Sequence, residues 1–493
     1  MSIPNSSEQQ DTPLHDSTLL LDGPVSLTLG SDSLLIVDDV HKSGRGCCGL
    51  CRSKTKTTHT IALHNVLGAE VNPSDVEITF AQPATKNDVT VTTVRYSISE
   101  KEKSTVEKWV QKLLDLAYGT AQRRKRLKVL VNPFGGKGTA ASLYQTYAAP
   151  VFAAANCELD VQNTEYRGHA TEIAAQLDLD AYDAIVCCSG DGLPYEVFNG
   201  LGKRPNAREA LAKLAVALLP CGSGNGMAWN CLGTGSVSIA ALAIVKAVRM
   251  PLDLVSITQN DTRTLSFLSQ SFGIVAESDL GTDHIRWMGA HRFTYGFLIR
   301  LLRQTIWPCD LAIKVEINDK KAIKEHYTAF ANRPVDTSAD RGRIEAAEQS
   351  PGLPELQHGT VLGELPTDWE IVPGTTMGNF YVGNMAIMSK DTNFFPASLP
   401  NDGLMDVITI DGTISLSTAL SMMNEIPTGR FFDMPDVKLR KATAFRLVPH
   451  EKEGYISIDG EQVPFEPFQA EIHQGLGTVL SKSGRIYEAD GPL

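Results

Sequence analysis

The sequence predicts an α/β nucleotide-binding domain with a mostly parallel sheet, joined to a domain of antiparallel strands that forms a β-sandwich. Three observations lead to this fold class. From Val129 onward, apolar strand-like runs alternate with helical patterns, which favours parallel strands with helices on both faces. After Pro251 the chain changes to short β-like runs, typical of an antiparallel domain. Before residue 120, similar β-like runs precede one helical segment.

Length and composition are those of a multidomain globular protein. With 493 residues, 42% of them hydrophobic and 21% charged, the chain is too long for one ordinary core. A formal net charge of −12 argues against binding of nucleic acid through bulk electrostatics. We find no apolar stretch of bilayer-spanning length and no secretory signal, and nine cysteines without regular spacing favour reduced thiols. We therefore expect a cytoplasmic protein.

The changes in pattern divide the chain into four parts. Residues 1–20 form a polar tail that we expect to be disordered. Residues 21–120 form a β-rich region, which resembles a pleckstrin-homology-like module in its order of elements and suggests a membrane or regulatory role. Residues 121–252 form the α/β domain, and residues 253–493 form the sandwich domain. Within the latter, residues 332–367 have scattered Pro, Gly, Asp and Glu, which predicts a disordered insertion in a loop.

Three glycine-rich loops follow strands of the predicted parallel sheet. They are VNPFGGKGTA (Val131–Ala140), SGDGLPYEVFNG (Ser189–Gly200) and LPCGSGNGMA (Leu219–Ala228). Glycines let a backbone approach a bulky ligand closely, and the N–H groups at a helix N-terminus bind phosphate. The first is not a Walker A loop, because Gly138 follows Lys137 where that motif requires Ser or Thr. Open α/β sheets bind ligands at the carboxyl ends of their strands, so the three loops together predict a nucleotide cradle.

These loops occur with further motifs in the order and spacing of the diacylglycerol kinase catalytic fold. The motifs are NPFGGKG, TEYRGHATEIA, SGDGLPYEVFNGL, LPCGSGNGMA, SDLGTDHIRWMGAHRFTYG, NDGLMDV and ISIDGEQV. The sequence looks most similar to the sphingosine kinase, or sphingoid long-chain base kinase, branch of this superfamily. The resemblance extends from about Lys128 to Ser481, and the β-rich start and cysteine cluster are similar to the fungal form of these kinases.

This resemblance implies a lipid kinase that uses ATP and Mg²⁺ to phosphorylate the primary hydroxyl of a sphingoid base, such as sphingosine, dihydrosphingosine or phytosphingosine. The lipid would lie in the sandwich domain, with ATP in the cleft between the two domains. Asp191 would be the general base, flanked by three further headgroup contacts: Ser189, Gly190 and Gly192. A loose phosphoryl-transfer transition state leaves the protein mainly positioning and charge compensation to supply.

The resemblance also implies a set of nucleotide contacts. Those to the base and sugar would be Asn132, Pro133, Phe134, Thr164 and Glu196. Those on the phosphate side would be Ser189, Gly222, Ser223, Gly224, Arg286 and Arg292. Guanidinium groups suit this role because they bind phosphate oxygens in pairs. Without the resemblance, two arginines spaced six apart would be interpreted as surface residues.

The ISIDGEQV motif carries the implied metal site, with Asp459, Gly460 and Glu461 near Mg²⁺ or the γ-phosphate. Glu461 lies on the same side as Asp459 if the strand continues, which would bring two carboxylates to one ion. The alternative is that Asp459 builds a hairpin turn, since Asp-Gly between β-like runs is a strong turn signal. Asp402 in NDGLMDV is predicted to be a turn residue. His169 is predicted to be a packing or capping residue rather than a catalytic base.

Asp279 would decide the substrate class, because the resemblance pairs it with the ammonium group of the lipid. That cation needs an anionic partner once it leaves water. Diacylglycerol and ceramide lack such a cation, so a buried carboxylate would penalise them. Ser269 either assists headgroup recognition or is a core serine, and the segment RFTYGFLIRLLRQTIW either lines the tail pocket or is a core helix.

Other functions compete with this one. A diacylglycerol or ceramide kinase would share the fold, but Asp279 argues against it. A non-enzymatic membrane-binding protein would not need Asp191 and Glu461 with their flanking glycines. A nicotinamide-nucleotide kinase has a similar glycine loop, without a reason for the motifs of the second half.

The segment HKSGRGCCGLCRSKTK predicts a membrane attachment. Three cysteines, Cys47, Cys48 and Cys51, lie among basic residues, which is typical of S-acylation assisted by anionic lipids. A zinc site and unmodified loop cysteines are the alternatives. The expected location is therefore peripheral, on intracellular membranes (endoplasmic reticulum, Golgi, endosome or vacuole) or on the plasma membrane.

Overall fold

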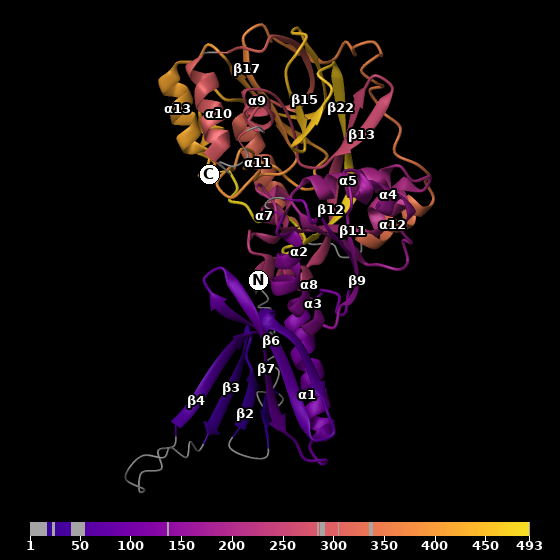
Figure 1. The fold of residues 1–493 in the computed structure, drawn as a ribbon, viewed down its shortest axis with the longest axis vertical. Coiled ribbons are helices and arrows are strands. Elements are labelled where there is room, and N and C mark those ends of the chain that lie inside the picture. Colours follow the sequence, from indigo (N-terminus) through magenta and orange to yellow (C-terminus); the bar gives the residue numbers. More distant parts are fainter. Residues whose placement is uncertain are drawn as a thin grey trace, which may run out of the picture. The chain divides into compact units, whose positions relative to one another are not determined.

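The computed structural model of the chain describes residues 17–21, 25–40, 55–135, 138–282, 285, 291–303, 305–334 and 339–492 (Figure 1). The chain forms two compact units. The first comprises Met1–Arg124 and Pro150–Cys157, and the second comprises Lys125–Ala149 and Glu158–Leu493. Apart from residues 121–124 and 150–157, which include most of helix α3 (Ala149–Ala154), the predicted α/β and sandwich domains thus lie together in the second unit.

The first unit is built on antiparallel strands, as the sequence predicts. One sheet contains β1 (Thr18–Leu20), β2 (Val25–Leu29), β3 (Ser33–Val40) and β4 (Thr55–Ala62), and a second contains β5 (Val66–Val71), β6 (Asp75–Thr85) and β7 (Asp88–Ser97). The expected disordered tail, residues 1–20, is wrong at its end, because Thr18–Leu20 pair with β2; residues 1–16 lie outside the described residues. The short helix η2 (Leu63–Asn65) joins the two sheets, and helix α1 (Lys103–Tyr118) follows β7. Apolar residues at helical spacing, including Val106, Trp109 and Leu113, are buried on α1.

A parallel sheet opens the second unit and confirms the predicted α/β architecture. Its strands are β8 (Arg126–Val131), β9 (Glu158–Asn163), β10 (Ala184–Ser189) and β11 (Ala215–Pro220), in the order β11-β10-β8-β9. The alternating helices are α2 (Ala140–Leu143), η3 (Tyr144–Ala148), α3 (Ala149–Ala154), α4 (His169–Gln176), α5 (Gly192–Gly202), α6 (Ala207–Lys213), α7 (Gly226–Leu232) and α8 (Val237–Lys246). Every residue of β10 and β11 is buried, which explains why these strands are continuous apolar runs in the sequence.

Antiparallel strands form the rest of the second unit, again as predicted. They are β12 (Val248–Gln259), β13 (Thr262–Ser266), β14 (Ser269–Gly273), β15 (Cys309–Ile317), β16 (Glu370–Val372), β17 (Met377–Gly383), β18 (Met405–Asp411), β19 (Lys438–Pro449), β20 (Ile456–Ile458), β21 (Glu461–Val463) and β22 (Phe468–Ser481). The accompanying helices are α9 (Ile274–Leu280), α10 (His291–Leu302), α11 (Lys320–Ala331), α12 (Ala339–Glu348), α13 (Leu416–Glu425) and η5 (Arg430–Asp433). Aromatic and β-branched residues fill the core between the strands, with Phe272, Phe380 and Phe445 almost fully buried.

Strand β22 joins the two halves of this unit into one sheet (Figure 1, yellow). It pairs antiparallel with β12 and β19, and it meets β11 in parallel at the pair Val216–Val479. The sandwich and the parallel sheet are therefore one hydrogen-bonded structure. This continuity fixes the sandwich residues relative to the glycine-rich loops.

No single helix in the described part of the chain is long and apolar enough to cross a bilayer. Helices α7 and α8 together have the required length and composition, but they are bent by 47° at the break between them. Most residues of both helices are buried in the second unit.

The insertion differs from its prediction. Instead of a disordered loop, the described part of residues 332–367 contains α12 and lies against the second unit. Arg343 donates to the Gly475 carbonyl (3.0 Å) and to Thr478 Oγ1 (2.6 Å), both on the β22 strand. Further along, the N–H groups of Gln357 and His358 both donate to the buried Glu471 carboxylate (2.9 Å). The charged and polar residues of this segment favour disorder when only the local sequence is considered. They are ordered in the structure because they form hydrogen bonds with residues that are distant in the sequence.

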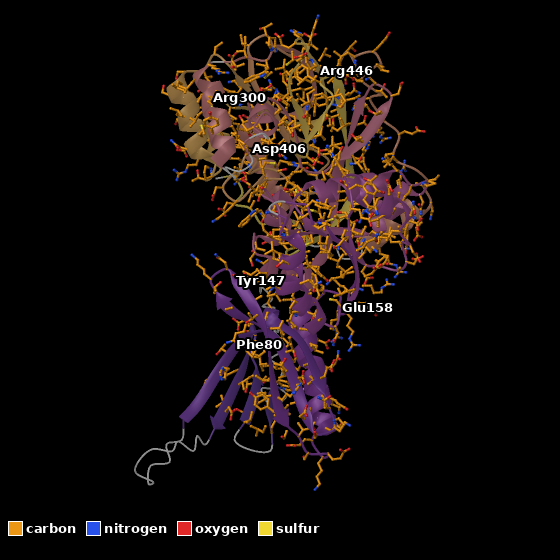
Figure 2. All side chains as sticks on the ribbon, viewed as in Figure 1. Phe80, Tyr147, Glu158, Arg300, Asp406 and Arg446 are labelled. Carbon is orange, nitrogen blue, oxygen red and sulfur yellow. The ribbon has the colours of Figure 1, made fainter. Side chains whose placement is uncertain are left out.

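Asp402 is more than the turn residue that the sequence predicts. Its Oδ1 does accept the Leu404 N–H within the turn (3.2 Å). Its Oδ2, however, accepts hydrogen bonds from Lys441 Nζ (3.2 Å) and His326 Nε2 (2.9 Å). Lys441 also reaches Asp406 Oδ2 (3.3 Å), which is labelled in Figure 2. A buried lysine needs such paired carboxylates, so Asp402 belongs to an ion network inside the sandwich.

We predict that Arg343→Ala destabilises the second unit by about 2 kcal/mol, because the oxygen atoms that now accept hydrogen bonds from the buried guanidinium would lose their donor. Arg341→Ala on the same helix is the matched control, since that side chain is 87% exposed and should change stability by less than about 0.5 kcal/mol. Denaturant unfolding measures both values, and limited proteolysis reports release of the insertion. Equal stability of the two variants would show that the insertion adds nothing to the fold.

Candidate active site at the carboxyl edge of the parallel strands

The three glycine-rich loops meet at one edge of the sheet, as predicted. A Cβ atom placed on Gly222 would lie 2.4 Å from Gly190 Cα, so the second and third loops touch backbone to backbone. The Cys221 N–H also donates to the Ser189 carbonyl (2.9 Å). On the other side, a Cβ on Gly135 would lie 2.9 Å from Ser189 Oγ. Only glycine permits approaches this close, which explains the glycines at these positions.

Asp191 is held at the junction of two of these loops. It precedes α5, and its carboxylate accepts the N–H groups of Gly226 (2.9 Å) and Met227 (3.0 Å), the first residues of α7. Burial raises the pKa of Asp191, although these backbone hydrogen bonds act to lower it. A carboxylate with two bound N–H groups keeps further lone pairs for a third donor. Asp191 is therefore a fixed, partly desolvated proton acceptor.

The third loop is closed by Asn225, which sequence reasoning missed. Its side chain accepts the Gly222 N–H (2.8 Å) and donates to the Gly222 carbonyl (2.9 Å). Its φ of +57° is one that asparagine tolerates better than most residues, and the asparagine before a glycine was the available signal. Ser223 is exposed between these fixed points, and Gly224 lies next to Asp191 Oδ2.

The predicted base and sugar contacts lie on the first loop and its neighbours. Asn132 Oδ1 accepts the Phe134 N–H (3.0 Å), and the Phe134 side chain, which follows Pro133, is 75% exposed. Thr164 is buried, and its N–H donates to the Val131 carbonyl (2.8 Å). An exposed aromatic ring beside a glycine-rich loop suits stacking against a nucleotide base.

Glu196 already has a structural role. Its two carboxylate oxygens accept the N–H groups of Gly168 (2.9 Å) and Ala170 (3.1 Å), at the start of α4. A contact with the sugar would have to use its remaining lone pairs. His169 Nδ1 accepts the Glu165 N–H (3.1 Å), in agreement with its interpretation as a capping residue.

The ISIDGEQV motif separates into two roles. Asp459, with φ of +53° before Gly460, accepts hydrogen bonds from Ser266 Oγ (2.7 Å) and from three backbone N–H groups, those of Phe267, Leu268 and Ser269 (2.9 Å each). Burial raises its pKa to about 6. Asp459 and Gly460, both with positive φ, form the turn between β20 and β21, as the turn alternative predicts. The Asp459 carboxylate is in addition occupied at the β13–β14 turn, so we do not propose it as a metal ligand.

Glu461 lies instead beside the loop that carries Asp191 and Gly192. Its Oε1 is 2.8 Å from a Cβ placed on Gly192, and its Oε2 forms an ion pair with Arg167. Arg167 lies between β9 and α4, so this pair connects the α/β half to β21 of the sandwich. Sequence reasoning missed Arg167, which stands within the quoted motif TEYRGHATEIA.

The described residues contain no group of three His, Cys, Asp or Glu side chains that would hold a metal ion on their own. Glu461 would suit a Mg²⁺ ion whose other ligands come from a bound substrate. This ion is commonly bound through one or two carboxylates together with substrate phosphates. Glu461 is 32% exposed and adjoins the glycine-rich loops, so it would share the ion with a bound nucleotide.

Ser269 and Asp279 come together around a buried tyrosine. Tyr381 on β17 is 5% exposed, and the Ser269 side chain lies near its hydroxyl and acts to lower the pKa of Tyr381. Burial is the main cause that raises the pKa of Tyr381, and the negative charge of the half-buried Asp279 on α9 raises it further. The structure therefore brings the two predicted headgroup residues to one place. Tyr381 was missed because NFYVGNMAIM looks like an ordinary buried strand.

Next to α9 lies an apolar cavity of about 60 Å³ within the sandwich half. Helix α10 contributes Phe297 and Leu301 to its lining. Arg300, labelled in Figure 2, also borders the cavity and forms an ion pair with Glu277 (3.2 Å). Helix α13 contributes Met422 to the same lining. The segment RFTYGFLIRLLRQTIW thus borders a cavity and also packs against the sandwich core, which agrees with either of its two predicted alternatives.

Several predicted residues lie outside what the structure describes. These are Arg286 and the cysteines Cys47, Cys48 and Cys51. Arg292 belongs to α10, but its side chain is not among the described ones.

Three family models match the chain. A domain of unknown function matches residues 17–119, the diacylglycerol kinase catalytic domain matches residues 126–257, and the YegS C-terminal NAD kinase beta sandwich-like domain matches residues 269–481. The first match covers the β-rich unit without assigning it a role. The other two cover the parallel strands and the sandwich, in agreement with the fold.

Curated relatives match along most of the chain. The sphingoid long chain base kinase 5 of Saccharomyces cerevisiae is 33% identical over 84% of this chain and 68% of its own length. The sphingoid long chain base kinase 4 of Schizosaccharomyces pombe is 33% identical over 76% of this chain and 79% of its own length. Human sphingosine kinase 1 is 28% identical over 74% and 92%. This protein belongs to the family of sphingoid long-chain base kinases and is a lipid kinase.

Proposed function

We propose that this lipid kinase transfers the γ-phosphoryl group of ATP to the primary hydroxyl of a sphingoid base, with Asp191 as the proton acceptor and Asp279 as the partner of the lipid ammonium. The observation that carries the proposal is the position of Asp191, fixed by two backbone N–H groups where the glycine-rich loops meet. A scaffold protein has no use for a desolvated carboxylate at that point.

In this mechanism Asp191 first orients the lipid hydroxyl by accepting its hydrogen bond. As the bond from the hydroxyl oxygen to the γ-phosphorus forms and the bond to the leaving ADP oxygen breaks, the hydroxyl proton passes to Asp191. Because the transition state is loose, this transfer comes late, after charge has moved to the nucleotide. The raised pKa of Asp191 makes it a better acceptor than an exposed aspartate.

Charge compensation falls to groups around the loops. The N–H groups of the exposed stretch at Ser223 and Gly224 are available for phosphate oxygens. Glu461, released from its ion pair with Arg167, would hold Mg²⁺, and the ion would supply positive charge to the nucleotide phosphates. Arg286 and Arg292 complete this set in our proposal, by the family resemblance alone.

Headgroup recognition rests on Asp279, Ser269 and Tyr381. The carboxylate supplies the anionic partner of the ammonium, and the hydroxyl groups supply neutral hydrogen bonds to the remaining polar atoms. The adjoining cavity would receive the start of the alkyl tail. A volume of about 60 Å³ accommodates only a few water-sized groups, so the pocket has to widen when a long tail enters.

Access to the lipid is the remaining part of the proposal. We propose that S-acylation of Cys47, Cys48 or Cys51, helped by neighbouring basic residues, anchors the protein to an intracellular membrane. The support is the sequence pattern, in which two acyl chains, or one with a basic patch, suffice for stable attachment.

We predict that phosphate transfer from Mg-ATP labels sphingosine and dihydrosphingosine strongly and diacylglycerol weakly. Asp279→Asn should raise KM for the two amines by roughly 10-fold, the effect of losing a hydrogen bond to a charged group. Asp436→Asn, at an exposed site, is the control and should leave both lipids unchanged. Labelling of diacylglycerol alone would overturn the substrate, and labelling of no lipid would overturn the proposed function.

The pH profile provides a second prediction. Asp191 must be ionised to accept a proton, and its pKa is raised in the fold, so activity should fall as the pH falls through that raised value. The acid limb of kcat/KM for sphingosine should therefore have its midpoint above about 3.9, the value of a free aspartate. A profile that stays flat down to the pH at which the protein unfolds would contradict the role of Asp191.

A further inference from the structure

Two cysteine thiols touch beneath the catalytic loops. Cys188 lies on β10 and Cys221 directly follows β11, and their Sγ atoms are 3.3 Å apart. Cys188 is fully buried and Cys221 is 7% exposed. Each is followed at once by a loop residue of the site, Ser189 in one case and Gly222 in the other.

We propose that Cys188 and Cys221 are a redox modification site, which a hydroperoxide converts into an intramolecular disulfide that lowers kinase activity. The covalent part stands on geometry alone. Its consequence for catalysis rests on the proposed function.

The geometry requires only a small movement. The strands are parallel neighbours, with Cys188 paired to Leu219 and Ser189 paired to Pro220. Cys221 thus lies two positions beyond the partner of Cys188, on the same face of the sheet, and its N–H donates to the Ser189 carbonyl (2.9 Å), which holds it beside the end of β10. Bond formation shortens the Sγ–Sγ distance from 3.3 Å to about 2.05 Å.

The two thiols differ in character. The hydrogen bond from Cys188 lowers the pKa of Cys221, whereas the same contact and burial raise the pKa of Cys188. Cys221 is therefore the thiol that reacts first, since the thiolate is the nucleophile. Its slight exposure also gives a small oxidant a way to reach it.

The reaction balances with hydrogen peroxide as the two-electron oxidant. The Cys221 thiolate attacks one peroxide oxygen, the O–O bond breaks, and Cys221 becomes a sulfenic acid while hydroxide leaves and takes a proton to form water. Cys188 then attacks the sulfenic sulfur, its proton leaves with the departing hydroxyl as a second water, and the S–S bond forms. A dithiol reductant reverses the change by exchange.

The two loops that follow the cysteines are in steric contact, so neither loop can move toward the other without displacing it. A Cβ on Gly222 would already lie 2.4 Å from Gly190 Cα, so the two backbones are in contact. Drawing the strand ends together shifts Gly190 and Gly222, and with them Asp191 relative to α7. A misplacement of about 1 Å at a catalytic group costs roughly 10²-fold in rate.

The test starts with the peptide map. Trypsin places Cys188 in residues 168–203 together with Cys187, and Cys221 in residues 214–246 together with Cys231. A Cys187→Ala/Cys231→Ala variant therefore leaves one cysteine in each peptide. After treatment with hydrogen peroxide and alkylation, we expect these two peptides to be linked by a disulfide. Alkylation of both cysteines without linkage would overturn the proposal.

The activity assay uses the same preparations. We expect peroxide to lower lipid phosphorylation at least 10-fold in wild type and in the Cys187→Ala/Cys231→Ala variant, and dithiothreitol to restore it. Cys221→Ala, normalised to its own reduced activity, should not lose activity in this reversible way. If Cys221→Ala fails to fold, two wild-type measurements decide the proposal: the disulfide between the two peptides after peroxide treatment, and the recovery of activity after dithiothreitol treatment. Linkage with unchanged activity would overturn the regulatory consequence, and linkage in a protein with no lipid kinase activity would overturn the proposed function instead.

Discussion

The site depends on one steric constraint, the backbone contact between Gly190 and Gly222. Two neighbouring strands of the parallel sheet end at the same level, and their loops approach until no side chain would fit between them. This approach brings α7 to Asp191, whose carboxylate accepts the N–H groups of Gly226 and Met227. A carboxylate held in this way cannot change rotamer without breaking two hydrogen bonds. The glycines thus fix the direction of the acidic group as well as making room for a nucleotide.

A second constraint connects the sandwich to this edge. Because β22 pairs with both β12 and β11, the antiparallel strands continue the parallel sheet. Asp459 uses its carboxylate to hold the β13–β14 turn, and so positions Ser269 beside Tyr381 and Asp279. The ISIDGEQV motif thus contains one acidic residue with a structural role, Asp459, and a second, Glu461, that lies beside the loop of Asp191 and Gly192.

The parallel sheet and its glycine-rich loops were predictable because each depends on local sequence. A strand buried on both faces is apolar throughout, as in β10, and a loop that touches another backbone needs glycine, as at Gly222. The insertion was predicted wrongly because its order depends on partners far away in the chain, such as Thr478 for Arg343.

The same reason explains the site residues that sequence reasoning missed. Arg167 is part of the site because it forms an ion pair with Glu461, which lies 294 positions away in the sequence. Tyr381 was missed because β17 pairs with β14, which brings Tyr381 opposite Ser271 and near Ser269. The alternation of residues along one strand does not reveal which strand lies next to it. Asp402 has a true turn contact, but composition gives no sign of the buried Lys441 that it also binds.

The most direct test of the account separates the chemical role of Asp191 from its structural role at α7. Asp191→Asn keeps an amide oxygen that accepts one N–H of α7, but it removes the proton acceptor. We would measure turnover of sphingosine together with the dissociation constants of ATP and sphingosine and the Tm of the variant. The account predicts that turnover falls by roughly 10²- to 10⁴-fold while both dissociation constants stay within a few-fold of wild type and the Tm changes little. Turnover within 10-fold of wild type, or a loss that merely follows weaker ATP binding or unfolding, would contradict it.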